Sequence, residues 1–436
     1  MEKLLRRLEK LIPKKLYRFF QPAYHYLMAM TGAIIYRFPS KKLFIIGVTG
    51  TKGKSSTVEI INAILEQAGF KTALSNTIRF KNGEKSKPNM YKMSMPGRFF
   101  MQKFLYDAVK NHCTHAVIEI TSEAARQYRN KFIDLDIFVF TNLAPEHIES
   151  HGSYEAYRNA KISIAKELVH SGKPLKAMVI NSDDEEAKHF LILPIKTKFS
   201  YSLKEIDAYH EDKNGLRFIY KKQLFTSPLI GKFNAYNILA GIKVGEEMGI
   251  KLDIIHDAIA EFGNISGRAE HIDCGQNFEV IVDYAHTPNS LEALYQAFDH
   301  AKKIISVLGN TGGGRDTWKR PEMGLLADKY ADHIILTNED PYDEDPLKIV
   351  NDIKKAIHNK PCEIIMDRRE AIAKALSFAT ENDAVLITGK GTDPYIMGPN
   401  GSKVPWSDAA VTKDELIKLI SLRVPVESEI SSEESS

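Results

Sequence analysis

A glycine-rich stretch with the sequence GVTGTKGKSS occupies residues 47–56, directly after an apolar run at 43–48 and before an amphipathic segment at 56–69. Glycines allow a backbone to wrap so closely that its N–H groups face phosphate oxygens, and the N-terminus of a following helix adds positive potential. A strand, a glycine-rich turn and a helix in this order are typical of nucleotide-binding proteins. The stretch therefore predicts a phosphate-binding loop for a nucleoside triphosphate.

Within this loop, we expect Lys54 to contact the terminal phosphates and Ser55 to bind Mg²⁺. The spacing is GxxGxxGKS, because Val48 occupies the first glycine position of the standard GxxxxGKS pattern. A bare turn is the alternative interpretation. The loop residues predicted to bind the nucleotide are Gly50, Thr51, Lys52, Gly53, Lys54, Ser55 and Ser56.

Short apolar runs alternate with helix-length segments along most of the chain. They lie at 115–120, 136–143 and 177–181, and the rhythm restarts with five runs that begin near residues 279, 304, 333, 362 and 383. Strands that alternate with helices indicate βαβ units and a mainly parallel sheet. We therefore predict an α/β fold, in which a P-loop ATPase domain with a parallel sheet precedes a Rossmann-like C-terminal domain.

Glycine and small polar residues near 263–267 mark the expected seam between the two domains. Before the first strand, we expect a basic helix that ends at Pro13 and then an aromatic stretch up to Ser40. The predicted division is a basic N-terminal segment (1–40), a central ATP-binding domain (41–264), a C-terminal Rossmann-like domain (265–424) and an acidic, disordered tail (425–436).

Composition excludes several classes of protein. Of the 436 residues, 43% are hydrophobic and 26% are charged, as in ordinary globular proteins. The net charge of +3 gives no reason to expect a nucleic-acid partner. The three cysteines are far apart and indicate neither a zinc site nor a disulfide framework. This cysteine pattern favours a reducing cytoplasm. The apolar stretch at 26–36 is about half of the roughly 20 residues that span a bilayer, so we expect neither a transmembrane helix nor a signal peptide.

Acidic residues and a histidine follow strands of the predicted sheet. Glu119 closes the run at 115–120, and Glu146 and His147 follow the next run. Because the carboxyl ends of parallel strands converge, we expect these side chains to meet the phosphates and bind Mg²⁺. Each of them alone is more often a structural or surface residue, so the prediction depends on their occurring together. Lys161, on the next helix, would by itself be interpreted as a solvated charge.

Eight motifs in this chain resemble those of the Mur ligases, in the same order. The chain looks most similar to the MurE type, which adds the third peptide residue to UDP-N-acetylmuramoyl-dipeptide, and the similarity runs from about residue 41 to 420. The motifs are GVTGTKGKSS, IEITSEA, TNLAPEHIESHGSYEAYRNAK, GKFNAYNILA, GRAEHI, VDYAHTP, GNTGGGRDTWKRPEMG and ITGKGTDPY.

The resemblance implies ATP-dependent amide-bond formation, with a peptide precursor of the cell wall and an amino acid as substrates. In that reaction ATP phosphorylates a carboxylate, and an amino group displaces phosphate from the acyl phosphate. A carboxylate is a poor electrophile, so phosphorylation supplies the leaving group while Mg²⁺ and Lys54 stabilise the developing charge.

The resemblance also assigns roles to individual residues. Lys54, Ser55, Glu119 and His147 match phosphate and Mg²⁺ residues, and Lys161 matches the lysine that the family carbamylates, which would make it an anion able to help hold the metal. The matches for nucleotide contacts are Asn237, Arg268 and Asp283, and those for contacts to the muramoyl-peptide are Ser94, Ser122, Gln127 and Arg129.

The chain departs from the family pattern within these motifs. Glu123 stands where the family has a histidine, and Met95 replaces a threonine, so one hydroxyl is lost. Tyr342 replaces the arginine with which diaminopimelate-adding enzymes clamp a distal carboxylate. We expect Asp340 and Asp393 to hold an amine instead, which favours a cationic amino acid such as lysine or ornithine. Diaminopimelate also carries amines and stays an alternative.

The largest difference lies before residue 41. MurE-type enzymes carry an N-terminal domain that holds the UDP-sugar, whereas only about 40 residues precede the first predicted strand here. We therefore expect the usual domain to be lacking, with a different mode of holding the substrate or an acceptor that is not UDP-linked. Basic residues at 3–18, interleaved with leucines, predict a peripheral contact with an anionic membrane. The alternative is a charged helix that packs one apolar face onto the protein.

Two other functions stay open at this point. One is a related ligase with another acceptor, of the pseudomurein peptide, folylpolyglutamate or cyanophycin type. The other is a nucleotide-binding subunit without turnover, which Glu123 and Met95 favour and which the presence of Lys54, Glu119, His147 and Lys161 disfavours.

Overall fold

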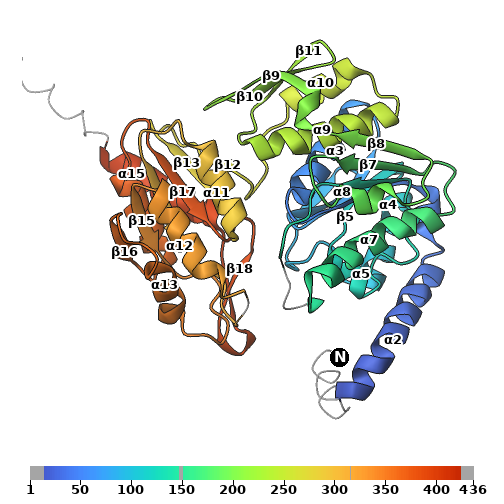
Figure 1. Cartoon of the computed structure of the whole chain (residues 1–436), viewed down its shortest axis with the longest axis horizontal. Helices are drawn as coiled ribbons and strands as arrows, with labels where there is room; N and C mark the ends of the chain where they lie inside the picture. Colours follow the sequence, from blue (N-terminus) through green and yellow to red (C-terminus); the bar gives the residue numbers. More distant parts are fainter. Residues whose placement is uncertain (1–13, 147–150, 315, 424–436) are drawn as a thin grey trace, which may run out of the picture. The chain divides into compact units, whose positions relative to one another are not determined.

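The computed structural model describes residues 14–146, 151–314 and 316–423 (Figure 1). The predicted helix before Pro13, the acidic tail from residue 425 and the candidate metal ligand His147 lie outside the described residues. The chain divides into two compact units, residues 1–263 and 264–436. No helix in the described part of the chain is both long and apolar enough to cross a membrane.

The first unit contains an eight-stranded sheet in the order β4–β3–β2–β5–β1–β6–β7–β8 among its described residues. The strands from β2 to β8 in this order are parallel, whereas β3 and β4 are antiparallel additions at one edge. The bounds are β1 (Phe44–Thr49), β2 (Thr72–Ser75), β3 (Arg79–Asn82), β4 (Lys85–Pro88), β5 (His115–Glu119), β6 (Ile137–Phe140), β7 (Ala177–Asn181) and β8 (Thr197–Tyr201).

Helices cover both faces of this sheet, so its central strands are almost wholly apolar and buried. On one face α3 and α9 pack so closely that a Cβ at Gly241 would lie 2.7 Å from Ile60. The helices of the unit are α3 (Lys54–Gln67), α4 (Arg98–Lys110), α5 (Ser122–Arg126), α7 (Tyr154–His170), α8 (Ala187–Leu191), α9 (Lys232–Glu247) and α10 (Leu252–Ala260), with 3₁₀ turns at Pro39–Lys42 and Leu203–Glu205.

The region before the first strand differs from the expected aromatic stretch, because it forms the long helix α2 (Lys14–Ile35). Its inner face buries His25, Ala29 and Ala33, which are four residues apart and therefore lie on one side of a helix. This face packs against α4. Phe20 and Tyr24 are each more than half exposed, and the abundance of aromatic residues concealed the helical period.

A small antiparallel sheet of the first unit was not expected from the sequence. It consists of β9 (Ile206–Asp212), β10 (Gly215–Tyr220) and β11 (Gln223–Ser227). Phe218 and Phe225 stack across β10 and β11 with ring centroids 5.6 Å apart, and β11 packs on α10. Its mixed, charged strands lack the apolar runs that reveal the large sheet.

The second unit contains a sheet in the order β12–β13–β17–β14–β15–β16, with α-helices along both faces of its described part. All neighbours are parallel except β12 and β13. The strands are β12 (Glu270–His271), β13 (Glu279–Asp283), β14 (Ile304–Leu308), β15 (His333–Leu336), β16 (Cys362–Ile364) and β17 (Ala384–Thr388), with a hairpin of β18 (Tyr395–Met397) and β19 (Lys403–Pro405) and a 3₁₀ turn at Pro399–Gly401.

The helices of the second unit are α11 (Pro288–Ala297), α12 (Lys319–Tyr330), α13 (Pro346–Lys354), α14 (Arg368–Phe378) and α15 (Asp408–Arg423). Arg368 and Asp408 join the starts of α14 and α15 through a fully buried ion pair with an Nη2–Oδ2 distance of 2.6 Å. The predicted α/β architecture, with a parallel-sheet P-loop unit followed by a second α/β unit, is confirmed.

Candidate active site

The glycine-rich loop connects β1 to α3, and two of its glycines are required by space. A Cβ at Gly50 would lie 1.9 Å from the Thr141 hydroxyl, and a Cβ at Gly53 would lie 2.3 Å from the Asn237 side-chain oxygen. Gly53 also has a φ of 79°, a left-handed conformation that glycine adopts without strain. The loop therefore runs in contact with the residues that follow β6 and with α9.

Residues at the end of β6 hold the loop in place. The Thr51 N–H donates to the Asn142 carbonyl at 2.8 Å, and the Lys52 N–H donates to the Asn142 side chain at 2.8 Å. The Thr141 hydroxyl donates to the Lys52 carbonyl at 2.7 Å. With these backbone groups paired, the N–H groups left for a phosphate are those of the first turn of α3, which have no acceptor within the helix.

Ser55 and Glu119 meet at the start of α3. The Ser55 hydroxyl donates to the Glu119 carboxylate at 2.7 Å, and that carboxylate is almost fully buried. Thr77 joins them, because its N–H and its hydroxyl both lie 3.1 Å from the same Glu119 oxygen. Sequence reasoning missed Thr77, although it follows β2, whose carboxyl end points to the same edge of the sheet.

Lys54 and Lys52 lie at the same loop. The Lys54 ammonium donates to the Thr51 carbonyl at 2.8 Å, and the Lys52 ammonium lies 3.1 Å from the Glu146 carboxylate. Glu146 is largely buried, so this ion pair is better shielded from water than a surface pair. Both lysine ammonium groups of the loop are therefore already bound to protein oxygen atoms.

Lys161, on α7, is buried beneath the loop. Its Nζ donates to the Gly50 carbonyl at 2.5 Å and lies 4.8 Å from the centre of the Tyr157 ring. Burial, with the neighbouring Lys54 charge, holds the pKa of Lys161 well below the usual lysine value, although Glu146 and Glu119 act in the opposite direction. Among the described residues, no carboxylate lies within ion-pair distance of this amine.

The side-chain chemistry around Glu119 fits Mg²⁺, which prefers oxygen ligands. Ser55 and Thr77 supply hydroxyls and Glu119 supplies a carboxylate, all within 3.1 Å of one another. The described residues contain no group of three or more histidine, cysteine or acidic side chains arranged as metal ligands. His147 lies outside them, so its predicted role at the metal stays a prediction.

The predicted nucleotide contact Asn237 lies against the loop. Its side-chain oxygen accepts from the Thr57 hydroxyl at 3.2 Å, and its amide donates to Asn234 at 3.0 Å. The same oxygen is the atom nearest to a hypothetical Cβ at Gly53. Asn237 therefore fixes the approach of α9 to the start of α3.

Three of the four predicted peptide-binding residues lie near a common loop. Arg129 donates to the Met95 carbonyl and to the Gln127 side chain, both at 2.7 Å. Gln127 donates in turn to Glu123, the residue that replaces the family histidine, at 2.7 Å. Ser94 precedes Met95, and its buried hydroxyl has no hydrogen-bond partner in the described part of the chain.

The fourth predicted residue, Ser122, connects the peptide-binding group to the phosphate loop. Its hydroxyl lies 3.1 Å from His151 Nε2, and the His151 ring packs edge-on to Tyr157 with centroids 5.2 Å apart. The Tyr157 hydroxyl is 3.0 Å from the Thr51 hydroxyl. His151 and Tyr157 were not singled out from the sequence, because their roles depend on helix α7 packing under the loop.

In the second unit, Asp283 organises the loop that carries Arg268. Its carboxylate accepts from the Ala269 and Ala285 N–H groups, each at 2.6 Å. The Arg268 guanidinium stacks on Tyr284 at 4.5 Å from the ring centre. Gly267 passes so close to residues 391–392 that a Cβ would lie 2.5 Å from the Thr392 nitrogen. Two motifs far apart in sequence therefore form one surface.

Asp340 and Asp393 lie around an amine, but that amine belongs to the chain itself. The fully buried Lys390 ammonium is 2.7 Å from Asp340 and 3.6 Å from Asp393. Asp340 also accepts from the Met397 N–H at 2.7 Å. Next to it, burial and the Asp340 charge raise the pKa of Glu339, whose carboxylate accepts from Thr311 at 2.7 Å. Sequence reasoning did not anticipate the Lys390 pairing.

The phosphate loop on a parallel sheet, with a carboxylate and a buried lysine at its end, defines a nucleotide-binding α/β enzyme. Residues 48–245 match the Mur ligase middle domain, and residues 267–391 match the Mur ligase glutamate ligase domain. A UDP-N-acetylmuramoyl-L-alanyl-D-glutamate–2,6-diaminopimelate ligase of Bacillus cereus is 36% identical over 380 residues, 84% of this chain and 77% of that protein. The chain therefore belongs to the Mur ligase family.

Other relatives agree with this assignment. A UDP-N-acetylmuramyl-tripeptide synthetase of Borreliella burgdorferi is 36% identical over 412 residues, 90% of this chain and 80% of that protein. A solved diaminopimelate ligase structure is 29% identical with a TM-score of 0.60, covering 87% of this chain and 79% of the other. Mycobacterium tuberculosis folylpolyglutamate synthase has a TM-score of 0.67 at 16% identity over 84% of this chain and 93% of that chain, which shows the shared fold.

These matches confirm the resemblance to Mur ligases and the prediction that the chain is a ligase. The family uses ATP with Mg²⁺. The roles of individual site residues stay predictions, which the geometry above makes specific enough to test.

Replacing Gly53 by alanine tests the close packing of the loop. The added methyl group meets Asn237, so we expect ATP affinity to fall more than tenfold, as measured by calorimetry. Gly69→Ala is the matched control: Gly69 has a similar φ of 84° but no atom within 4 Å of a Cβ. It should lose about 1 kcal/mol of stability through backbone strain and keep its ATP affinity. Equal ATP affinities in the two variants would contradict this account.

Proposed function

We propose that the chain is an ATP-dependent ligase that joins the carboxyl group of a muramoyl-peptide cell-wall precursor to the amino group of an amino acid. The observation that carries this proposal is the convergence of Ser55, Glu119 and the buried Lys161 on one phosphate loop, with Arg129 and Ser122 on the adjoining elements. Because ATP is the phosphoryl donor, we place the reaction in the cytoplasm.

In the first step, an oxygen of the peptide carboxylate attacks the γ-phosphorus of ATP, the bond to the β–γ bridging oxygen breaks, and ADP leaves. In the second step, the amino nitrogen attacks the acyl carbon, loses a proton and displaces inorganic phosphate. Lys54 and the N–H groups at the start of α3 orient the phosphates, and Arg129 holds the peptide end. Ser55 and Glu119, together with His147 as the sequence predicts, would hold Mg²⁺, which would neutralise charge on the phosphates.

For the nucleotide, we propose contacts from Asn237 in the first unit and from Arg268 and Asp283 in the second. Asn237 sets the position of the loop through Gly53, whereas Asp283 shapes the backbone on both sides of Arg268. Arg268 then presents a guanidinium on the Tyr284 ring, a fixed cation suited to a phosphate.

We further propose that Lys161 acts as a carbamate. Addition of its neutral amine to CO₂, with loss of a proton, forms an N–C bond and leaves an anion where a cation would be repelled by Lys54 and Mg²⁺. The low pKa caused by burial keeps the amine neutral, and therefore reactive, at a pH where ordinary lysines are charged. The carbamate would add an oxygen ligand beside Glu119.

For the added amino acid, we propose one with a second amine, such as lysine, ornithine or diaminopimelate. Asp393 supports this proposal. Its side chain is 16% exposed, and its carboxylate lies 3.6 Å from the Lys390 ammonium, which is also paired with Asp340. Tyr342 offers no charged fork for a distal carboxylate.

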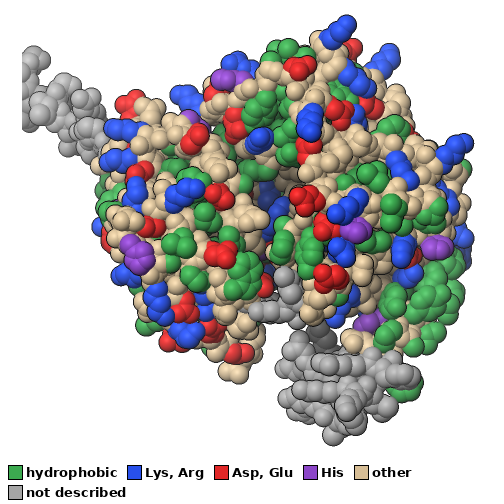
Figure 2. Space-filling view, in the orientation of Figure 1, with side chains coloured by type: hydrophobic (Ala, Val, Ile, Leu, Met, Phe, Trp, Pro, Cys, Tyr) green, Lys and Arg blue, Asp and Glu red, His purple; other side chains and the backbone are tan. Residues whose placement is uncertain are grey.

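We also propose a peripheral contact between the N-terminal region and an anionic membrane. The outer face of α2 carries Phe20, Tyr24, Leu27, Ile34 and Ile35, each more than half exposed. Figure 2 shows hydrophobic side chains gathered at the lower right, where α2 lies in Figure 1. Residues 1–18 contain seven lysines and arginines against two glutamates, and basic charge beside an apolar helix face is typical of interfacial helices.

Isotope tracing tests the reaction itself. With oxygen-18 in the acceptor carboxylate, ATP, Mg²⁺ and each of lysine, ornithine and diaminopimelate, we expect labelled inorganic phosphate, detected by mass spectrometry, and one amide product. Unlabelled phosphate during synthesis would exclude the acyl phosphate. If no phosphate is released with any of the three amino acids, the chain is instead a nucleotide-binding subunit without turnover.

Substitution of Lys161 tests the carbamate. We expect Lys161→Ala to lose turnover by at least 100-fold and to recover part of it with short carboxylic acids, which replace the carbamate oxygen ligands, as measured by phosphate release. Carbon-13 bicarbonate should give a carbamate NMR signal in the wild type only. Lys166→Ala, on the exposed side of the same helix, is the control and should behave as wild type. Full activity of Lys161→Ala would refute the carbamate role.

Vesicle sedimentation tests the membrane contact. We expect binding to vesicles with anionic lipid, and the double variant Phe20→Ser, Leu27→Ser should bind at least tenfold more weakly, because two apolar side chains no longer leave water. Leu224→Ser with Leu325→Ser removes two equally exposed apolar groups elsewhere and should bind as wild type. Equal binding by both double variants would contradict the role of α2.

A further inference from the structure

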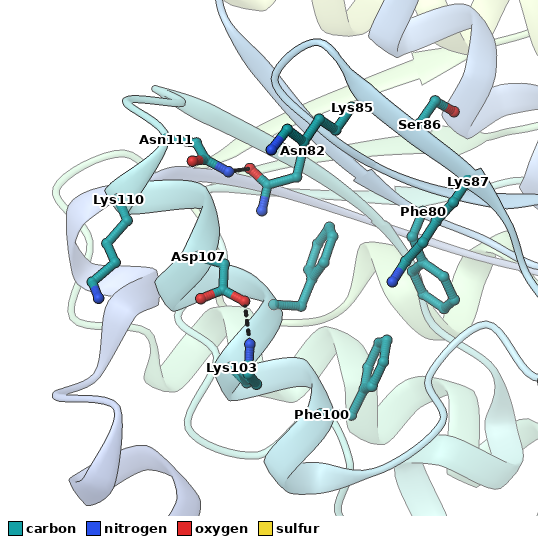
Figure 3. A pocket seen from close by; sticks show the side chains of 11 residues that line it. Phe80, Asn82, Lys85, Ser86, Lys87, Phe100, Lys103, Asp107, Lys110 and Asn111 are labelled. Carbon is teal, nitrogen blue, oxygen red and sulfur yellow. Dashed lines mark hydrogen bonds and ion pairs between the residues drawn. The ribbon is translucent and has the colours of Figure 1, made fainter.

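A pocket of about 390 Å³ lies between the β3–β4 hairpin and α4, away from the phosphate loop (Figure 3). None of the residues that line it belongs to the nucleotide, metal or peptide groups described above. Strands β3 and β4 are the antiparallel additions at the edge of the large sheet, and Phe80 on β3 packs against Phe100 and Phe104 on α4. The pocket is therefore a separate feature of this unit whose lining indicates what it binds.

The floor of the pocket is aromatic. Phe80 on β3 lies between Phe100 and Phe104 on α4, with ring centroids 5.0 Å and 6.0 Å away. Phe80 and Phe104 are buried, whereas Phe100 is half-buried and also contacts Tyr91 at 5.3 Å. Such a cluster offers apolar ring surface to a planar or hydrocarbon group.

The rim of the pocket is strongly basic. It contains four lysines and a single carboxylate, Asp107, which is already paired with Lys103 at 2.6 Å. In the described part of the chain, no carboxylate lies within ion-pair distance of Lys85 or Lys87, both on β4. Lys110, at the other end of α4, lies over the Tyr106 ring. A ligand that fits this rim carries several negative charges close together.

An amide pair adds hydrogen-bonding groups beside the lysines. The Asn111 side chain donates to the Asn82 side chain at 3.0 Å, as the dashed line in Figure 3 shows. Because each amide has both donor and acceptor groups, the pair keeps one NH₂ and one carbonyl oxygen for a ligand. The pocket therefore combines a ring surface, amide groups and clustered positive charge.

The elements that form the pocket also lead to the active site. β3 begins at Arg79, two residues after Thr77, which bonds to Glu119, and extends about 10 Å from there to Asn82. α4 begins at Arg98, directly after the loop at 94–96 to which Arg129 bonds. Both elements that line the pocket therefore begin beside the residues of the candidate active site.

We propose that this pocket binds a diphosphate group at the far end of the acceptor, with the unit attached to that diphosphate resting on the phenylalanine rings. The inference rests on the proposed ligase function for its acceptor, but the binding site itself does not require turnover. A diphosphate matches the excess of lysines, and both a nucleoside and an isoprenoid chain match the aromatic floor. The shared chemistry is the diphosphate next to an apolar or planar group.

Calorimetry with three probes tests this pocket on the full chain, with saturating Mg-ADP to occupy the phosphate loop. The probes are inorganic pyrophosphate, UDP and farnesyl diphosphate. We expect Lys85→Ala with Lys87→Ala to weaken binding of every probe that the wild type binds by at least tenfold, because each lysine makes a charge-assisted contact. Phe100→Ala should weaken UDP or farnesyl diphosphate but leave pyrophosphate unchanged.

The control is Lys196→Ala with Lys213→Ala, which removes two exposed positive charges from the same unit outside the pocket. It should bind all probes as the wild type does. Tighter binding of UDP than of pyrophosphate identifies a nucleotide-linked acceptor, and tighter binding of farnesyl diphosphate identifies a lipid-linked one. Wild-type affinity of the Lys85, Lys87 variant for all three probes overturns the proposal, as does the absence of binding.

Failure of this inference can be told apart from failure of the proposed function. If no acceptor supports phosphate release but the lysine-dependent binding is present, the ligase proposal fails and the pocket stands. If the ligase is active and KM for the acceptor is the same in the Lys85, Lys87 variant and the wild type, the pocket assignment alone is wrong.

Discussion

The burial of Lys161 against the Gly50 carbonyl is the contact on which the site depends. A charged ammonium is costly to bury, and burial lowers the pKa of Lys161, whose Nζ donates a hydrogen bond to the phosphate loop in this structure. The loop is therefore supported from below by α7 and from the side by residues 141–142. A loop held on two sides presents the start of α3 to phosphates without further rearrangement.

The sequence was sufficient to predict the features that depend on local order. The loop at 47–56, its flanking strand and helix, and the alternation of β and α segments follow from glycine positions and apolar periods, which act over a few residues. The meeting of Ser55 with Glu119 was also predictable, because the carboxyl ends of parallel strands converge. The Mur ligase resemblance then supplied Lys161, which no local pattern would have selected.

The features that were missed depend on tertiary packing. Thr77 reaches Glu119 only because β2 lies next to β5, and nothing in the sequence gives that order. Lys390 pairs with Asp340 because the end of β17 lies beside the segment that follows β15. Asp340 and Asp393, which were expected to face a substrate amine, therefore face the Lys390 amine of the same chain. In α2, the many aromatic residues hid a helix whose buried face includes His25, Ala29 and Ala33.

The contacts of Lys54 and Lys52 indicate which of the two cations moves when ATP binds. Lys54 donates to the Thr51 carbonyl and Lys52 pairs with Glu146, so both cations are positioned before a nucleotide arrives. A phosphate oxygen carries a full charge, whereas a carbonyl carries only a dipole, so transfer of Lys54 from Thr51 to a phosphate is favourable. Lys52 lies in a true ion pair and gains less from such a transfer. We therefore expect the Lys54 ammonium to move from the Thr51 carbonyl to a phosphate of bound ATP. The ion pair between Lys52 and Glu146 then keeps the loop in its present conformation.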